Sequence, residues 1–189
     1  MQAVARQEPR LRWTVGTRSD GSTVVATDLA GGWVPPGVGV PRGADLLEPG
    51  SPVTLRDVVK DSDFHAEFTP GQPLSDTRVG LSDLPRQVDQ IPDLARKLRQ
   101  ATQWRDGLPS VAHTLAYAWA HGGGARPIEL EELHRARAAQ REAVLDSYHA
   151  GEVDPHEVGN WMLLAAIDAV HNKQPWLANY HFTWFDSLG

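Results

Sequence analysis

Proline is distributed so unevenly along this chain that it divides the sequence into two parts with different folding rules. Half of the 14 prolines fall between residues 30 and 75, in runs such as GGWVPPGVGVPRGADLLEPGSPV and TPGQP. Because proline fixes one backbone angle and lacks an amide donor, this part cannot form long helices or strands. From about Leu81 onward, apolar residues recur with the spacing of amphipathic helices. This contrast predicts an α+β protein.

The first part has the signals of a small β-rich unit. Residues 11–29, LRWTVGTRSDGSTVVATDL, contain two runs rich in Val, Thr and Trp on either side of Asp20-Gly21. An Asp-Gly pair accepts the positive backbone angles of a tight hairpin turn. Further on, FHAEF at residues 64–68 alternates apolar and polar side chains, which is the period of a half-buried strand. We predict a unit that contains one β-hairpin and at least one more strand.

The second part has the signals of a helical bundle. Its apolar residues recur every three or four positions, prolines stand at the first turns, and glycines follow the last turns. We expect four to five helices packed with the β-rich unit. The predicted organisation is a disordered leader at residues 1–10, the β-rich unit at 11–80 and the helical domain at 81–189. The predicted helices span Pro92 to Gly107, Pro109 to the glycines at 122–124, Pro127 to Gly151 and Pro155 to about His171, with a short helix and a tail after them.

Charge and composition exclude several classes of function. The 18 Lys and Arg residues against 24 Asp and Glu residues give a net charge of -6, which repels phosphate backbones and disfavours nucleic-acid binding. No run approaches the roughly 20 apolar residues that span a bilayer, so we expect no membrane insertion. The chain has no cysteine, which excludes disulfides and thiolate metal sites. An abrupt start of the predicted structure at Leu11 suggests a fragment of a longer protein.

The string PHEVGN, residues 155–160, is one residue short of a zinc-protease signature. That signature needs two histidines four residues apart, so that both imidazoles meet one ion from the same helical face. Asn160 stands where the second histidine would be, and a neutral amide is a poor zinc ligand. Asp154 at N-cap, Pro155 at N1 and Glu157 at N3 are instead the pattern of a capping box with a first-turn proline. We predict a helix cap here and no metal site.

An export signal is a second interpretation of the same region. Tyr148 to Glu152 reads YHAGE, a Tyr-x-x-x-Glu string of the kind that type VII secretion machinery recognises. Three tyrosines and 24 acidic residues among 189 give about 0.4 such strings by chance. The known signal also follows a helical hairpin with Trp-x-Gly, and none of the seven tryptophans here precedes x-Gly. We interpret Tyr148 as a residue near a helix end and keep an exported effector as an alternative.

Eight histidines invite a search for a catalytic base. They are scattered along the chain, with no Gly-x-Ser-x-Gly elbow and no cysteine nucleophile beside them. His171 and His181 with Asp186 could in principle surround a metal ion, but histidines near helix ends more often satisfy local carbonyls or solvent. We predict no catalytic, cofactor-binding or metal-binding residues. The runner-up is a hydrolase whose site is assembled only in three dimensions, with two or more histidines beside an acid in a cleft.

Aromatic residues are the better candidates for function. Trp33, with Pro35 and Pro36, lies in a stiff loop, and Trp184 with Phe185 lies near the end of the chain. Exposed aromatic side chains on stiff segments suit contacts with proteins. These five residues are therefore the candidate partner-binding set, weighed against the alternative that each aromatic ring is buried in the core.

The run WTVGTRSDGSTVVATDLAGGWVPPGV, with LLEPG, FTPGQPL and the helical half after it, resembles the C-terminal region of mycobacterial type VII (ESX) secretion-associated proteins. That family includes the chaperone-like EspK and uncharacterised relatives. The resemblance implies a non-enzymatic adaptor that binds a secreted substrate in the cytoplasm and brings it to the secretion apparatus. It carries no catalytic residue over to this chain, and it implies a protein partner and no cofactor.

Overall fold

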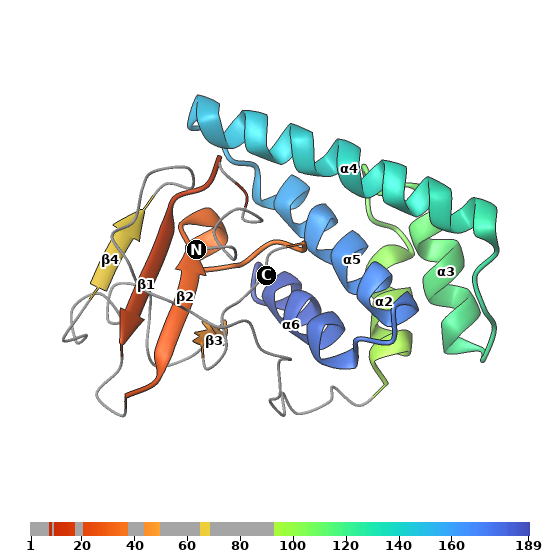
Figure 1. Cartoon of the computed structure of the whole chain (residues 1–189). Coiled ribbons are helices and arrows are strands. Elements are labelled where there is room, and N and C mark those ends of the chain that lie inside the picture. Colours follow the sequence, from red (N-terminus) through yellow and green to blue (C-terminus); the bar gives the residue numbers. More distant parts are fainter. Residues whose placement is uncertain (1–7, 9, 18–20, 38–43, 50–64, 69–92) are drawn as a thin grey trace. The chain divides into compact units, whose positions relative to one another are not determined.

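A computed structural model of the chain describes residues 8, 10–17, 21–37, 44–49, 65–68 and 93–189 (Figure 1). The chain divides into two compact units, Met1–Pro85 and Arg86–Gly189. The first contains strands and the second contains helices, so the α+β class predicted from the proline distribution is confirmed. The predicted boundary at residues 80 and 81 lies outside the described residues.

The first unit contains a four-stranded sheet with the order β3-β2-β1-β4. The predicted hairpin is present, because β1 (Trp13–Thr17) pairs antiparallel with β2 (Thr23–Thr27) and Trp13 lies opposite Thr27. Gly21 has a φ of +83°, as expected for the glycine of that turn. The predicted strand at residues 64–68 forms β4 (His65–Phe68), which pairs antiparallel with β1. The sequence did not predict β3 (Ala44–Leu46), which pairs parallel with β2.

A short loop after β2 is fixed by side-chain hydrogen bonds. The Thr27 hydroxyl donates to the Trp33 carbonyl and accepts from the Leu29 amide. Between Thr27 and Trp33 lies a 3-10 turn, η2 (Leu29–Gly31), in which Ala30 has a positive φ of 50°. Before β1, the Trp13 indole Nε1 donates to the Glu8 carbonyl at 3.1 Å. Glu8 therefore makes an ordered contact, although it lies in residues 1–10, which the sequence predicts to be a disordered leader.

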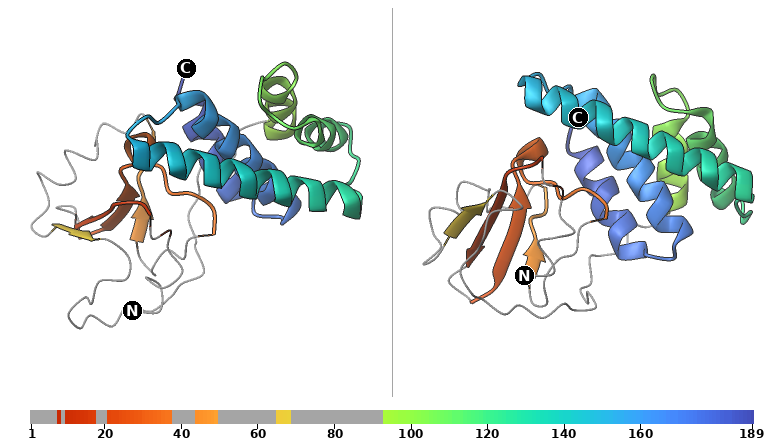
Figure 2. Two further views of the ribbon diagram at one scale, coloured as in Figure 1. Left: turned by 90° about the horizontal axis from the view of Figure 1, so that it is seen from above. Right: turned by 45° about the horizontal axis from the view of Figure 1, so that its top comes forward.

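The described residues of the second unit, 93–189, form five helices, shown in green to blue in Figure 1. The long helix α4 runs along one side of the unit, and α5 and α6 lie side by side next to it (Figure 2). The neighbouring helices α2 and α3 pack against each other and against α5. The bounds are α2 (Leu94–Thr102), α3 (Ser110–Ala120), α4 (Pro127–Ala150), α5 (Pro155–His171) and α6 (Pro175–Asp186).

The ends of α4 and α5 follow the predicted signals. Asp154 Oδ1 accepts a hydrogen bond from the His156 amide at 2.8 Å, and Pro155 occupies the first turn of α5. Gly151 stops α4 with a φ of +76°. The predicted cap at Asp154 is thus confirmed, and a cap of this kind stabilises a helix by about 1 kcal/mol.

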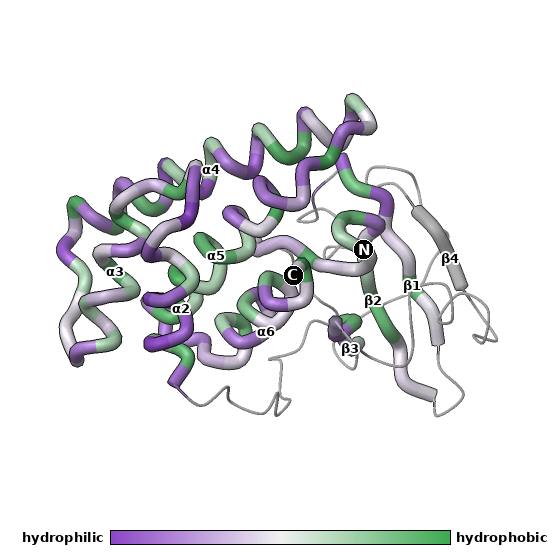
Figure 3. Tube along the Cα trace, turned by 180° about the vertical axis from the view of Figure 1, so that it is seen from behind, coloured by the Kyte–Doolittle hydropathy of each residue, from purple (hydrophilic) through white to green (hydrophobic). Residues whose placement is uncertain are grey.

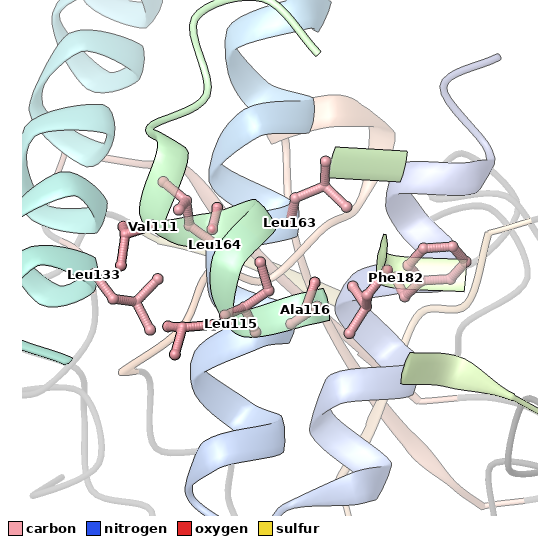
Figure 4. Close-up of a cluster of buried hydrophobic side chains, with 11 residues drawn as sticks. Val111, Leu115, Ala116, Leu133, Leu163, Leu164 and Phe182 are labelled. Atoms are coloured by element: carbon pink, nitrogen blue, oxygen red, sulfur yellow. The ribbon is translucent and has the colours of Figure 1, made fainter. Parts of the chain in front are cut away.

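The core of the helical unit is apolar and is centred on α5. Most of α5 is buried, from Val158 to Ala169. Side chains from α3, α4 and α6 meet those of α5 in the cluster drawn in Figure 4. Burying a Leu or Phe side chain stabilises a fold by about 1.5–3 kcal/mol, so this cluster holds the five helices together. Its labelled members are Val111, Leu115, Ala116, Leu133, Leu163, Leu164 and Phe182.

Candidate functional site

Trp104 is the most exposed large hydrophobic residue of the described chain, with 87% of its surface accessible. It follows α2, in a connection to α3 that the sequence predicted as part of a longer helix ending at Gly107. The helix ends earlier because residues 103–109 turn away, and Gly107 adopts a positive φ of 71°. A tryptophan in water leaves a large apolar area unburied. Tryptophan is also enriched at protein–protein interfaces and among the residues that contribute most to binding.

Arg105, the next residue, fixes the backbone that presents Trp104. Its Nε donates to Asn160 Oδ1 at 2.6 Å, and its Nη2 donates to the His156 carbonyl at 3.1 Å. The guanidinium also lies 4.8 Å from the centre of the Phe185 ring, a cation–π distance. The α2–α3 connection is therefore fastened to α5 and α6 within the helical unit.

Asn160 completes this attachment from α5. Its Nδ2 donates to the Asp106 carbonyl at 3.1 Å, while its Oδ1 accepts from Arg105. Both ends of one amide side chain are therefore used, and Asn160 is only 2% exposed. A histidine at this position would lose this pair of contacts. The residue that departs from the zinc-protease signature is the one that holds the connection.

Gly159 leaves room for the Arg105 side chain. A Cβ placed on Gly159 would lie 2.5 Å from Arg105 Nη2, which is closer than carbon and nitrogen approach without a bond. Burial lowers the pKa of Arg105, and the negative charge of Asp154 partly offsets that effect. The pKa of a free guanidinium is so high that Arg105 still carries its charge at neutral pH.

A row of aromatic and imidazole side chains also lies on α3. Tyr117 is 50% exposed, and its ring stacks on that of His121 at 4.2 Å between centroids. His113 lies one turn earlier, with its Nδ1 3.2 Å from the Thr102 hydroxyl of α2. Among the described residues, Tyr117 on α3 and Trp104 in the α2–α3 connection are the two large exposed aromatic side chains of the hydrophobic class.

The hydrolase alternative has one structural counterpart, around Asp168 of α5. Asp168 is 8% exposed and binds Arg137 of α4 through a short ion pair. It also lies 3.0 Å from His134 Nε2. His181 of α6 is fully buried, and desolvation, together with the positive charge of Arg137, lowers its pKa to about 3. A carboxylate beside a histidine is part of a catalytic triad, but no serine or threonine hydroxyl of the described residues bonds to His134.

The structure does not bring the proposed metal ligands together. His181 is buried, His171 is half-buried and Asp186 is exposed. Among the residues that the structure describes, no group of three or more His, Asp or Glu side chains is placed to hold a metal ion. Within that same part of the chain, no helix is long and apolar enough to cross a membrane.

The predicted partner-binding residues lie mostly inside the protein. Trp33 is 0% exposed and Trp184 is 5% exposed, so neither indole offers a free surface. Pro35 is buried and Pro36 is half-buried, while Phe185 is half-buried beneath the Arg105 guanidinium. The structure favours the alternative that these rings belong to the core. Partner binding by these five residues stays a prediction, and their aromatic rings do not form an exposed face.

Sequence reasoning missed Trp104, although one signal was available. The apolar stripe of α2 consists of Leu94, Leu98 and Ala101, and Trp104 lies off that stripe by about one quarter of a turn or more at 100° per residue. The sequence predicts one helix as far as Gly107, and on that helix Trp104 lies outside the apolar stripe. The partners of Arg105 and Asp168 lie on other helices, so the sequence near these two residues does not identify them.

Comparison with known proteins gives matches over nearly the whole chain. Residues 91–188 match a family of unknown function, DUF5631, and residues 1–70 match a second family of unknown function, DUF5632. The uncharacterized protein Rv2082 of Mycobacterium tuberculosis is 33% identical over 193 residues, which cover 97% of this chain and 26% of Rv2082. The chain thus spans about a quarter of the length of that curated relative.

A solved structure is also similar. It is a fragment, residues 184–410, of the conserved hypothetical protein Rv3899c from Mycobacterium tuberculosis. The TM-score is 0.79 with 34% identity, and the match covers 98% of this chain and 89% of the fragment. The expectation of uncharacterised mycobacterial relatives is therefore confirmed.

Proposed function

This chain belongs to the family of unknown function DUF5631, and we propose that it is a non-enzymatic protein-binding module that acts as an adaptor. The observation that carries the proposal is the 87% exposure of Trp104 on a backbone fastened by Arg105 and Asn160. Tryptophan contributes more binding energy at protein interfaces than almost any other residue. A backbone that is already fixed loses little entropy when a partner binds, which favours affinity.

The wider role that we propose is in type VII (ESX) secretion. The partner would be a secreted substrate, bound in the cytoplasm and delivered to the secretion apparatus. Support comes from the resemblance of the WTVGT to WVPPGV segment to secretion-associated proteins and from the mycobacterial origin of its relatives. The fastened loop suits an adaptor because such a protein has to present a preformed surface.

The test is direct binding to candidate partners. Purified chain is titrated by calorimetry with each secreted protein that is encoded next to its gene. For the partner that binds, Trp104→Ala should weaken the affinity about 30-fold, which corresponds to about 2 kcal/mol. Ile128→Ala is the matched control, because Ile128 is an equally apolar, 62% exposed residue on α4. An affinity that Trp104→Ala leaves unchanged would contradict the proposal.

A hydrolase is the second candidate, and the His134–Asp168 pair is the observation that favours it. Hydrolysis of ester and peptide reporter substrates by the purified protein, with and without zinc or manganese, tests it. Activity lost in His134→Ala, or a bound stoichiometric metal ion with a large thermal stabilisation, would replace the adaptor proposal.

An exported effector is the remaining alternative. The Tyr148–Glu152 string lies at the end of α4, where the Glu152 amide donates to the Ser147 carbonyl at 3.0 Å. Substituting Tyr148 and Glu152 by alanine leaves that backbone hydrogen bond available. Loss of export without loss of folding in the double variant would support this alternative.

A further inference from the structure

The outer face of α2 differs in charge from the rest of the helical unit. The helix contains Arg96, Lys97 and Arg99 and no acidic residue, in a chain whose net charge is -6. Arg96, Gln100 and Gln103 are exposed, and Lys97 and Arg99 are half-buried on the two sides of them. Much of α2 is accordingly purple in Figure 3. We name Arg96, Lys97, Arg99, Gln100, Gln103 and Trp104 the α2 face.

Trp104 stands at the C-terminal end of this face. At 1.5 Å per residue, Lys97 lies about 7.5 Å along the helix from Thr102, the last residue of α2, and Trp104 follows two residues later, so one short partner segment can touch both. Two acids flank the face. Asp93 forms an exposed ion pair with Arg96 at 3.4 Å, and the exposed Asp106 follows Arg105. The exposed ion pair contributes little and can be replaced by a partner's carboxylate.

Arg99 adds an independent indication. Its Nε is buried but donates no hydrogen bond to any acceptor in the described part of the chain. A buried donor without an acceptor costs roughly 1–3 kcal/mol, and because this atom is covered, a partner's oxygen atom reaches it only if the Arg99 side chain moves. Arginine and tryptophan are also enriched in the parts of interfaces that carry the binding energy.

We propose that the α2 face binds a segment of a partner protein that combines acidic side chains with an apolar or aromatic anchor. The anchor covers Trp104, and the carboxylates pair with Arg96, Lys97 and Arg99. This inference rests on the proposed protein-binding function and specifies the chemistry of the partner. Charge complementarity of this kind sets the partner's identity and its orientation.

An anionic membrane would meet the same charges but fits less well. A basic helix that lies on a bilayer inserts its apolar stripe into the lipid. In α2, that stripe is already used, because Leu98 is 0% exposed and Leu94 and Ala101 pack against the core cluster. Only Trp104 remains available for insertion, and one side chain gives little membrane affinity.

The experiment uses the whole chain and a phage-displayed library of random 12-residue peptides. Selection on the wild-type chain, with counter-selection on Trp104→Ala, should enrich peptides that have a net negative charge and at least one large apolar residue. A synthetic peptide of the enriched sequence is then titrated by fluorescence polarisation. We expect Trp104→Ala to weaken it about 30-fold.

Charge variants test the face itself. Arg96→Gln with Lys97→Gln should weaken the selected peptide about tenfold and reduce the dependence of its affinity on salt. Arg135→Gln with Arg141→Gln, on α4, is the matched control and should change neither quantity. Equal effects of the two double variants would show that net charge, and not the α2 face, determines binding.

The possible outcomes separate the two proposals. Enriched peptides that are neutral or basic but still depend on Trp104 would overturn this inference and leave the protein-binding function standing. Phosphatidylglycerol vesicles that bind through Trp104, without any enriched acidic peptide, would assign the face to membranes. Both proposals would be overturned if the selected peptides and the secreted proteins bind the Trp104→Ala variant as well as they bind the wild-type chain.

Discussion

Arg105 and Asn160 are joined by a 2.6 Å hydrogen bond from Arg105 Nε to Asn160 Oδ1, although 55 positions separate them in the sequence. The bond fastens the α2–α3 connection to α5. Asn160 also binds the Asp106 carbonyl, and Arg105 also reaches the His156 carbonyl and the Phe185 ring. One arginine and one asparagine therefore determine where Trp104 is presented.

Replacing Arg105 should loosen that connection. Arg105→Ala removes two hydrogen bonds and leaves the buried Asn160 carbonyl oxygen without its donor, so we expect a loss of about 2 kcal/mol in the free energy of unfolding. Arg105→Lys keeps the positive charge but cannot make the same fork of bonds, and it should recover less than half of the loss. Urea denaturation followed by circular dichroism measures both. A full recovery by lysine would show that charge alone matters.

Gly159→Ala should be destabilising only while Arg105 is present. The new Cβ would lie 2.5 Å from Arg105 Nη2 and would displace the guanidinium. Overpacking of this kind costs about 1–3 kcal/mol. In an Arg105→Ala background the space is free, and alanine in a helix is then more stable than glycine by roughly 0.5–1 kcal/mol. A double-mutant cycle of unfolding free energies tests this change of sign, and additive effects would contradict it.

Asp168 should be needed for stability because it neutralises Arg137 between α4 and α5. Asp168→Asn leaves a partly buried guanidinium without its counter-ion, which we expect to cost about 2 kcal/mol after allowing for the exposed part of Arg137. His134→Ala should cost less than about 0.5 kcal/mol, since the His134 side chain is 53% exposed. Thermal and urea unfolding of the two variants separate these effects. The reverse order would point to a special role for His134.

His181 should make the fold sensitive to mild acid. Burial and the Arg137 charge lower its pKa from 6.5 to about 3 in the folded chain. Between these values the unfolded chain binds a proton that the folded chain does not, so stability is fully present above pH 6.5 and falls as the pH decreases. The slope for one proton approaches about 1.4 kcal/mol per pH unit.

The check is unfolding at pH 5.0 to 7.0, where few carboxylates titrate. His181→Gln cannot bind the proton, and its stability should change less with pH than that of the wild type, whatever its value at pH 7. His149→Gln on the exposed end of α4 is the control and should keep the wild-type slope. An unchanged slope in His181→Gln would contradict the assignment.

Trp104→Ala should leave folding almost unchanged. The side chain is 87% exposed, so its removal creates no cavity, and we expect a change within about 0.5 kcal/mol in the free energy of unfolding. Trp161→Ala in α5, where the side chain is 1% exposed, should cost about 3–5 kcal/mol. Equal losses would mean that Trp104 packs against the protein in solution and is not available to a partner.

The sequence by itself determined most of the elements and several of their ends. The Asp20-Gly21 pair, the alternation at residues 64–68 and the prolines at the first turns of α4 and α5 act over a few neighbouring residues, so their effects are readable locally. The cap at Asp154 is of the same kind. Short-range rules also explain why HEVGN forms the first turns of a helix.

Only the tertiary structure decided which residues meet. The parallel pairing of β3 and the partners of Arg105 and Asp168 depend on segments far apart in the sequence, and nothing near those residues names the partner. Burial follows the same rule. Trp33, Trp184 and Trp104 have the same side chain but differ in how many residues of the fold pack around it. Exposure is a property of the assembled fold, and for that reason the sequence selected Trp33 and Trp184, whereas the structure exposes Trp104.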